Sequence, residues 1–286
     1  MSKASFLLGS SSLILHAMSL DLAVCQEGVP QNFQREELVA WCVVPFDAKK
    51  RGPEERAKML VQLGIKRCAY DWRSEHVAEF EEEIRQYQKH GIEFFAFWKG
   101  HEEAFALFEK HGIRPQIWHT LRSPKSGSSE EKVRVATEAM VPLARRCQEA
   151  GCSLGLYNHG GWGGEPANMV AVCENLREKG FEKVGIVYNW HHGHDRMAQW
   201  KEDLALLQPY LLCLNLNGMN KGADPKILML GQGQHEASMV SDLLNHGYAG
   251  PIGILDHQKE VDAKVALQGN LDGLETLLRD PGKTSE

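Results

Sequence analysis

Short runs of apolar residues alternate along the chain with longer stretches in which apolar residues recur at helical spacing. Eight of the short runs are rich in aliphatic, aromatic and β-branched residues, as strands are, and each is followed by a helical pattern. The predicted strands are Leu38–Phe46, Lys66–Trp72, Glu93–Lys99, Arg114–Leu121, Ser153–His159, Lys183–Asn189, Tyr210–Asn217 and Pro251–His257. The repeat averages about 30 residues, which suits one strand, one helix and two loops.

A glycine stands between a helical pattern and the next strand in five places, at Gly91, Gly112, Gly151, Gly180 and Gly247. Glycine readily adopts the left-handed backbone that ends many helices. We therefore predict an α/β fold, a single-domain (β/α)8 TIM barrel over residues 31–286. A doubly wound sheet is disfavoured because no GxGxxG phosphate loop follows the first predicted strand.

The first 30 residues differ from the rest of the chain. Lys3 precedes an apolar stretch that continues to Cys25, interrupted by His16 and Asp21. A basic residue followed by an apolar segment is typical of a secretory signal, so we predict a leader over residues 1–30 and an exported protein, periplasmic or secreted. The alternative is a cytoplasmic protein. No other segment has the roughly 18 continuous apolar residues that a membrane span requires.

Composition narrows the classes of function. The 286 residues include 32 Lys and Arg against 38 Asp and Glu, a formal net charge of −6, and no basic stripe interrupts this balance. A nucleic-acid partner is not expected, because phosphate binding needs a cluster of positive charge. The seven cysteines are scattered singly, which favours buried free thiols over a disulfide framework or a zinc site.

Polar and aromatic side chains collect where the predicted strands end, which is where a barrel of this kind binds its ligand. The densest group is Asn189-Trp-His-His-Gly-His, in which three imidazoles follow a buried strand. Imidazole binds borderline metals and transfers protons near neutral pH. The predicted catalytic residues are His159, His192, His194, Asp256 and His257.

Aromatic faces suit the C–H surfaces of sugars, and amides suit their hydroxyl groups, so the expected ligand is a small-molecule sugar or sugar derivative. The predicted substrate-binding residues are Asp71, Trp72, Arg73, Trp98, His119, Asn158, Trp162, Asn189, Asn215 and Asn217. For any one of them alone, a helix cap or an ordinary hydrogen bond is the better explanation of the residue. Their convergence at one end of a barrel is what favours a site.

Over most of residues 38–279 the chain resembles the xylose-isomerase-like barrels, a superfamily of sugar-phosphate isomerases, epimerases and related lyases. The best match is C-terminal, in Leu230-Gly-Gln-Gly-Gln before a helix and Gly247-Tyr-Ala-Gly-Pro-Ile-Gly-Ile leading into the last strand. The resemblance implies an isomerase, epimerase or lyase that acts on a sugar or keto-sugar. It also implies a divalent metal held by Glu, Asp, His and Glu on strands five to eight.

The metal ligands implied by this resemblance are replaced in this chain. Their positions fall at Tyr157, Asn189, Asn215 and near Leu255. Amide and aliphatic side chains offer no anionic oxygen to a hard divalent ion. Two alternatives follow: a relocated site for one divalent ion, zinc, manganese, nickel or cobalt, or no metal. The candidate ligands for a relocated site are His159, Glu165, His192 and His194.

Two functions are consistent with these residues. The first is an isomerase, epimerase or lyase in which a histidine transfers a proton, assisted by Asp256 or His257. Lysines are sparse at the predicted strand ends, which disfavours a Schiff-base mechanism. The alternative is a carbohydrate-binding pseudo-enzyme that has lost its metal site. We favour the enzyme, because several imidazoles add little to binding but serve proton transfer near neutral pH.

Overall fold

Eight parallel strands close into one barrel, in which each strand pairs with its neighbour in sequence and β8 pairs with β1. The computed structural model describes residues 28–279, and the predicted leader lies outside them except for residues 28–30. The strands are β1 (Val39–Trp41), β2 (Arg67–Tyr70), β3 (Glu93–Trp98), β4 (Gln116–Thr120), β5 (Ser153–Tyr157), β6 (Val184–Asn189), β7 (Leu211–Leu216) and β8 (Ile252–Leu255). The predicted (β/α)8 barrel is confirmed.

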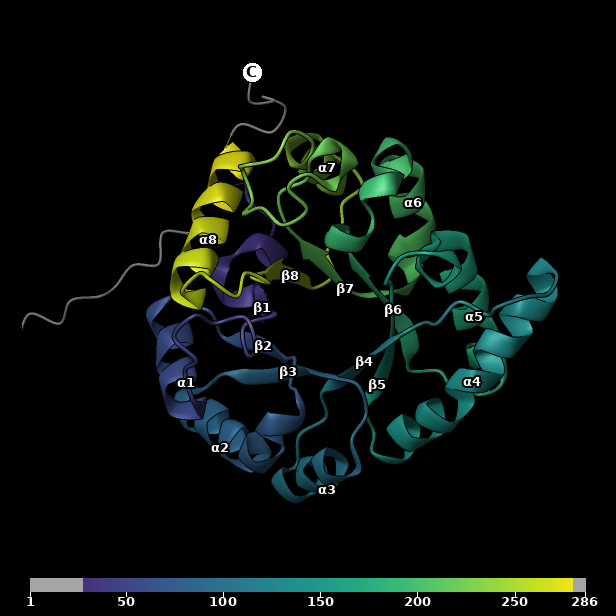
Figure 1. The fold of residues 1–286 in the computed structure, drawn as a ribbon, viewed down its shortest axis with the longest axis horizontal. Coiled ribbons are helices and arrows are strands. Elements are labelled where there is room, and N and C mark those ends of the chain that lie inside the picture. Colours follow the sequence, from purple (N-terminus) through teal and green to yellow (C-terminus); the bar gives the residue numbers. More distant parts are fainter. Residues whose placement is uncertain (1–27, 280–286) are drawn as a thin grey trace, which may run out of the picture.

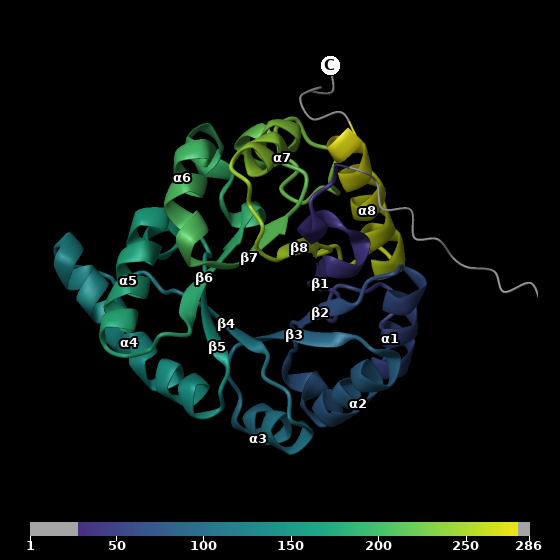
Figure 2. The ribbon, with the colours of Figure 1, turned by 180° about the vertical axis from the view of Figure 1, so that it is seen from behind.

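Eight α-helices surround the barrel, as Figures 1 and 2 show from opposite sides. They are α1 (Pro53–Gln62), α2 (Phe80–His90), α3 (Glu102–His111), α4 (Ser129–Glu149), α5 (Pro166–Glu178), α6 (Trp200–Leu207), α7 (Glu236–Asn245) and α8 (Ala263–Arg279). All five junction glycines have φ between 61° and 91°, the left-handed backbone predicted for them. Within residues 28–279 the structure contains no helix long and apolar enough to cross a bilayer.

The first strand is shorter than predicted. β1 stops at Trp41 because Cys42 adopts a φ of 61°, which turns the backbone out of the strand. The segment from Val43 to Phe46 is buried for the most part, but it forms bends and turns and does not extend the sheet. Its backbone is held by Asp71, whose carboxyl oxygen accepts a hydrogen bond from the Val44 amide at 3.1 Å.

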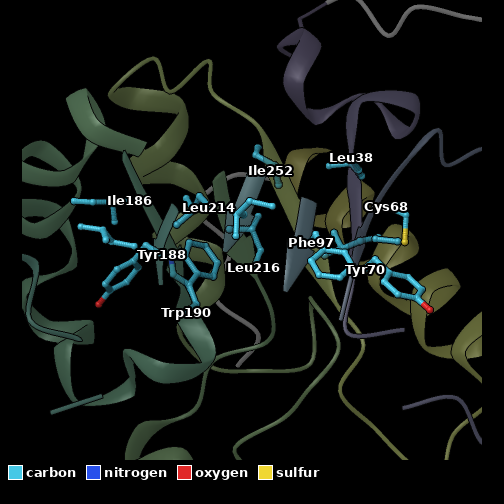
Figure 3. Close-up of a cluster of buried hydrophobic side chains, with 14 of the residues drawn as sticks. Leu38, Cys68, Tyr70, Phe97, Ile186, Tyr188, Trp190, Leu214, Leu216 and Ile252 are labelled. Carbon is cyan, nitrogen blue, oxygen red and sulfur yellow. The ribbon is translucent and has the colours of Figure 1, made fainter. Parts of the chain in front are cut away.

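The apolar core has two layers. Outward-facing side chains such as Tyr70, Phe97 and Tyr188 pack between the strands and the helices, and part of this layer is drawn in Figure 3. Inside the barrel lies a second cluster that contains the aromatic residues Trp41, Phe95, Trp118 and Tyr157. Burial of each large side chain contributes about 1.5–3 kcal/mol, so the two layers supply the main stabilisation of the barrel.

The cysteines of the described chain are all buried and free, as predicted; Cys25 lies outside the described residues.

Candidate functional site

Four histidines form a continuous row at the carboxyl ends of β5, β6 and β8. The ring centroids of His159 and His192 are 4.2 Å apart, those of His192 and His191 are 4.0 Å apart, and those of His191 and His257 are 4.9 Å apart. The structure thus brings together three predicted catalytic residues and adds His191. We call His159, His192, His191 and His257 the imidazole row.

The turn after β6 places the centre of this row. Asn189 caps the turn by accepting a hydrogen bond from the His191 amide at 3.2 Å. Trp190 is fully buried in the outer core, where its ring meets Trp200 at 5.3 Å. Because Trp190 is anchored outward, the next two residues are directed toward the barrel end, and His192 lies 5.8 Å from the ring of Tyr157 inside the barrel.

His257 closes the row on the other side of the barrel end. Its backbone has a φ of 55°, a left-handed conformation that turns the chain sharply after β8. The imidazole stacks on Phe46, with ring centroids 3.9 Å apart, and its Nδ1 lies 3.5 Å from the sulfur of Cys42. The second ring nitrogen, Nε2, has no protein partner within residues 28–279.

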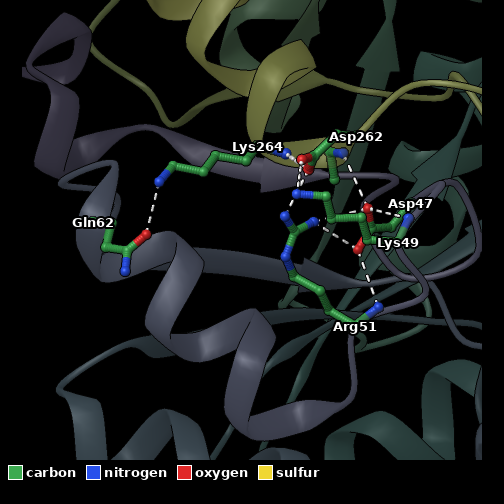
Figure 4. Close-up of polar contacts among 7 residues, drawn as sticks. Asp47, Lys49, Arg51, Gln62, Asp262 and Lys264 are labelled. Carbon is green, nitrogen blue, oxygen red and sulfur yellow. Dashed lines mark hydrogen bonds and ion pairs between the residues drawn. The ribbon is translucent and has the colours of Figure 1, made fainter.

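A polar network fixes the loop that carries Phe46 (Figure 4). The Asp47 carboxylate accepts hydrogen bonds from the amides of Lys49, Arg51 and Ala263, each at 3.1 Å. The Arg51 guanidinium bridges Asp47 at 2.9 Å and Asp262 at 2.7 Å. These contacts tie the loop after β1 to the start of α8, and they hold Phe46 against His257.

Three imidazoles of the row, those of His191, His192 and His257, are held in the neutral form. Burial lowers the pKa of His192 to about 3 and that of His257 to about 4. Burial also lowers the pKa of His191, and the neighbouring His192 adds to this effect. Positive charge on Lys226 contributes at all three rings. Neutral imidazole is the form that accepts a proton, so the row can act as a base near neutral pH.

Two carboxyl groups lie buried close to Cys42, at the end of β1. Burial raises the pKa of Asp71 to about 7 and that of Asp256 to about 8, and the charge of Asp71 adds to the rise at Asp256. Asp256 is fully buried, and neither of its side-chain oxygens has a hydrogen-bond partner in the described part of the chain. Asp256 is therefore largely protonated at neutral pH and does not contact solvent.

The stability of the protein should depend on the titration of Asp256. Folding raises the pKa of the Asp256 carboxyl group from 3.8 to about 8. Between these two pH values the folded state therefore keeps a proton that the unfolded state has released. The resulting stabilisation is complete below pH 3.8 and is lost as the pH rises to about 8, a change on the order of a few kcal/mol. Urea unfolding of the wild type and Asp256→Asn at about pH 5 and about pH 8.5 measures it. We expect the wild type to lose more stability than the variant; parallel losses would contradict the assignment.

Four predicted substrate-binding amides are fully buried: Asn158, Asn189, Asn215 and Asn217. Asn158 exchanges two hydrogen bonds with the backbone of Asn189, at 2.7 Å and 3.1 Å, and so joins the ends of β5 and β6. Asn217 donates to the Gly218 carbonyl at 2.8 Å. These amides stabilise the backbone at the strand ends. Their contact with substrate remains a prediction.

The other predicted residues spread around the same end of the barrel. Half-buried Trp98 faces the barrel interior, 4.8 Å from the ring of Tyr157. Trp72 donates its indole N–H to the Trp98 carbonyl, and Trp162 packs against the outer core. His194 is partly buried beside the row, with Nδ1 3.1 Å from the His191 carbonyl. Burial lowers the pKa of half-buried His119, with Arg122 and Lys99 contributing.

The positions implied for a divalent metal do not fit one. The Tyr157 hydroxyl accepts hydrogen bonds from the side-chain N–H groups of Trp41, at 3.3 Å, and of Asn189. Asn215 is the register partner of Asn189, and Leu255 is fully buried in the interior cluster. A phenol, two amides and a leucine supply neither a carboxylate nor an imidazole.

The candidates for a relocated metal site are also not gathered into one group. His159 and His192 are neighbours, but the Glu165 carboxylate pairs with Arg196 at 2.8 Å. Over residues 28–279, no group of three or more His, Cys, Asp and Glu side chains is arranged to hold a metal ion.

Two of the pockets at this end of the barrel are lined by members of the imidazole row, one beside each end of the His191–His257 contact. The larger, of about 630 Å³, is lined by Phe46, Arg73, His257 and Lys259, among others. The smaller, of about 300 Å³, is lined by His191, His192, His194 and Lys226, among others. The imidazole row therefore presents rings to both pockets.

Sequence reasoning missed several residues at these pockets: Cys42, Phe46, Lys226 and Lys259. His191 belonged to the histidine-rich run but was not selected as a site residue. The expectation that lysines are sparse at this end was wrong, because Lys226 and Lys259 come from loops beyond the strand ends. A search of the residues two to eleven positions after each predicted strand would have found both.

No protein-family model matches the sequence, and no curated protein matches it either. Several solved structures match this chain, and each match covers most of both chains. The apo form of 3-keto-D-glucoside 4-epimerase YcjR from E. coli is 12% identical with a TM-score of 0.64, and the match covers 85% of this chain and 99% of that one. IolI with a bound zinc atom is 11% identical with a TM-score of 0.66, covering 86% and 99%.

A D-psicose 3-epimerase from Clostridium cellulolyticum H10, solved with D-tagatose, is 10% identical with a TM-score of 0.57, and the match covers 84% of this chain and 96% of that one. These structures, with two others described as xylose isomerase domain proteins, are xylose isomerase-like TIM barrels. This chain has their fold, and the resemblance seen in its sequence is confirmed at that level.

Proposed function

We propose that this chain is a sugar isomerase or epimerase in which the imidazole row moves a proton on a carbon atom next to a carbonyl group. The observation that carries the proposal is the row itself, four rings between 4.0 Å and 4.9 Å from their neighbours, in contact with two pockets. The similar structures named as epimerases of sugars and keto-sugars support the same class of substrate.

His257 is the base that this proposal favours. Cys42 is buried, which raises the pKa of its thiol. With the Nδ1–H of His257 directed at the Cys42 sulfur, the lone pair of Nε2 is left for the substrate. Nε2 takes the proton from carbon, the C–H electron pair forms the double bond of an enediolate, and the carbonyl oxygen becomes the oxyanion.

The enediolate collapses when a proton returns to carbon. If the hydroxyl proton of the first carbon passes to the oxyanion and the carbon-bound proton returns to the former carbonyl carbon, the carbonyl group has moved and the product is an isomer. Return of the proton to the opposite face of the first carbon restores the original carbonyl group and gives an epimer. His191 contacts His257, and His192 contacts His191 in turn. These two rings are the groups proposed to return the proton or to relay it. The oxyanion would be stabilised by cationic side chains at the pockets, such as Lys226 and Lys259.

A second function has its own supporting observation. The Tyr157–Asn189 hydrogen bond joins two of the positions that the resemblance assigns to metal ligands, which favours a carbohydrate-binding protein without catalysis. Proton exchange distinguishes the two functions, because binding alone leaves carbon-bound hydrogen in place.

The test is proton NMR of ketoses and keto-sugars incubated with the protein in D₂O, with and without a chelator. We expect the signal of the hydrogen next to the carbonyl to disappear for at least one sugar, at a rate that the chelator does not change. His246→Gln serves as a matched control, because His246 lies after α7, at the opposite end of the barrel, and bonds to the Asp242 carbonyl. Sugars that bind but keep all their hydrogen would contradict the enzyme and leave the binding function.

A further inference from the structure

The geometry points to a sugar that carries an anionic group, a carboxylate or a phosphate, which Arg73 and Lys259 bind above the Phe46–His257 stack. This inference rests on the proposed function for the sugar, but its evidence is separate. It comes from the larger of the two pockets, which we call the Arg73 pocket.

Two cations converge on one aromatic ring in the Arg73 pocket. The Arg73 guanidinium carbon lies 5.6 Å from the centroid of the Phe46 ring, and the Lys259 ammonium lies 5.9 Å from it. Phe46 in turn stacks on His257, a member of the imidazole row. An anion placed between the two cations is therefore next to the proposed base.

Arg73 is held in position by the protein without being neutralised. Its Nη1 donates to the carbonyls of Asp71 at 2.6 Å and Trp72 at 2.8 Å. Across residues 28–279, neither Arg73 nor Lys259 forms an ion pair, whereas Arg51, close by, pairs with two aspartates. A fixed guanidinium with free N–H groups is suited to a carboxylate or a phosphate.

The lining of the Arg73 pocket contains more cationic than acidic side chains, although the whole chain has a formal charge of −6. Glu75 is the one acidic residue in its lining, and it is exposed. Asp71 lies below and is buried, and burial raises its pKa to about 7, which reduces its negative charge. Two cations against one exposed carboxylate give a local field that favours an anionic ligand.

Such a ligand would also change the proposed base. Arg73, Lys226 and Lys259 all lower the pKa of His257, after the larger effect of burial. A bound anion offsets this positive charge and raises the pKa of the imidazole toward its ordinary range, where it is a stronger base. The anionic group would thus bind the sugar and activate His257 together.

The experiment is isothermal titration calorimetry with three matched probes: neutral D-glucitol, D-gluconate and D-glucitol 6-phosphate. We expect at least one anionic probe to bind about tenfold or more tightly than glucitol, and Arg73→Gln and Lys259→Gln each to weaken that binding by about tenfold. The control is Lys66→Gln, which removes an exposed cation that forms no ion pair within residues 28–279 and lies just before β2, at the opposite end of the barrel. It should bind like the wild type.

The preferred probe identifies the anion as a carboxylate or a phosphate. Equal binding of glucitol and both anions, or anion binding that neither substitution weakens, would overturn the inference. Its failure is distinct from failure of the proposed function. Proton exchange on neutral sugars without anion binding would reject the inference alone, and anion binding without exchange on any sugar would reject the function alone.

Discussion

Replacing Arg56 with leucine is expected to lower the free energy of unfolding by about 3–5 kcal/mol. Arg56 on α1 and Glu83 on α2 form an ion pair whose side chains are 3% and 0% exposed. The second guanidinium nitrogen of Arg56 donates to the Arg51 carbonyl, in the loop that carries Phe46. Without the guanidinium, the Glu83 carboxylate stays buried with no cation beside it. Urea unfolding monitored by circular dichroism measures the loss.

Two further variants make this result interpretable. Arg56→Leu combined with Glu83→Leu should recover most of the lost stability, because the buried charge that causes the loss is gone. Lys58→Gln breaks the exposed pair with Glu54 on the same helix and should change stability by no more than about 0.5 kcal/mol. An Arg56→Leu protein as stable as the wild type would mean that solvent reaches Glu83.

Replacing His192 with glutamine is expected to lower the rate of proton exchange on the substrate by about 10²–10⁴-fold. His192 occupies the middle of the imidazole row, in contact with both His159 and His191. Glutamine retains hydrogen-bonding capacity, but it cannot accept and return a proton near neutral pH. The exchange assay in D₂O measures the rate, and the circular dichroism spectrum should not change.

His246→Gln is again the matched control, since it makes the same substitution at a histidine outside the site. An exchange rate unchanged in His192→Gln would remove the centre of the row from the mechanism. If His257→Gln alone abolished exchange, the chemistry would be confined to the Arg73 pocket.

The barrel could be predicted because its signals are local. Each strand is a short apolar run, and each of five helices ends in a glycine whose left-handed backbone is favoured by its own chemistry. The end of β1 could not be predicted in this way. Cys42 turns the chain with a left-handed backbone unusual for cysteine, and the hydrogen bond from the Val44 amide to Asp71, the residue after β2, stabilises the turn.

The location of the candidate site could be predicted, but not the orientation of its side chains. Closure of the barrel brings the strand ends together, so His159, His192 and His257 meet although 98 residues of sequence separate the first from the last. Whether a strand-end amide faces a ligand or the protein depends on tertiary packing, and Asn158 binds the backbone of Asn189 instead. Lys226 and Lys259 depend on the course of loops, which periodicity does not determine.

The tryptophans of the aromatic cluster inside the barrel also provide an intrinsic spectroscopic signal for ligand binding. The indole rings of Trp41 and Trp118 are 4.8 Å apart, and those of Trp41 and Trp98 are 5.7 Å apart. Indoles at such separations couple their electronic transitions, which should give this chain a strong near-ultraviolet circular dichroism signal. Trp98 is the partly exposed tryptophan of these three. A molecule that binds at this end of the barrel should therefore shift the tryptophan emission without any added label.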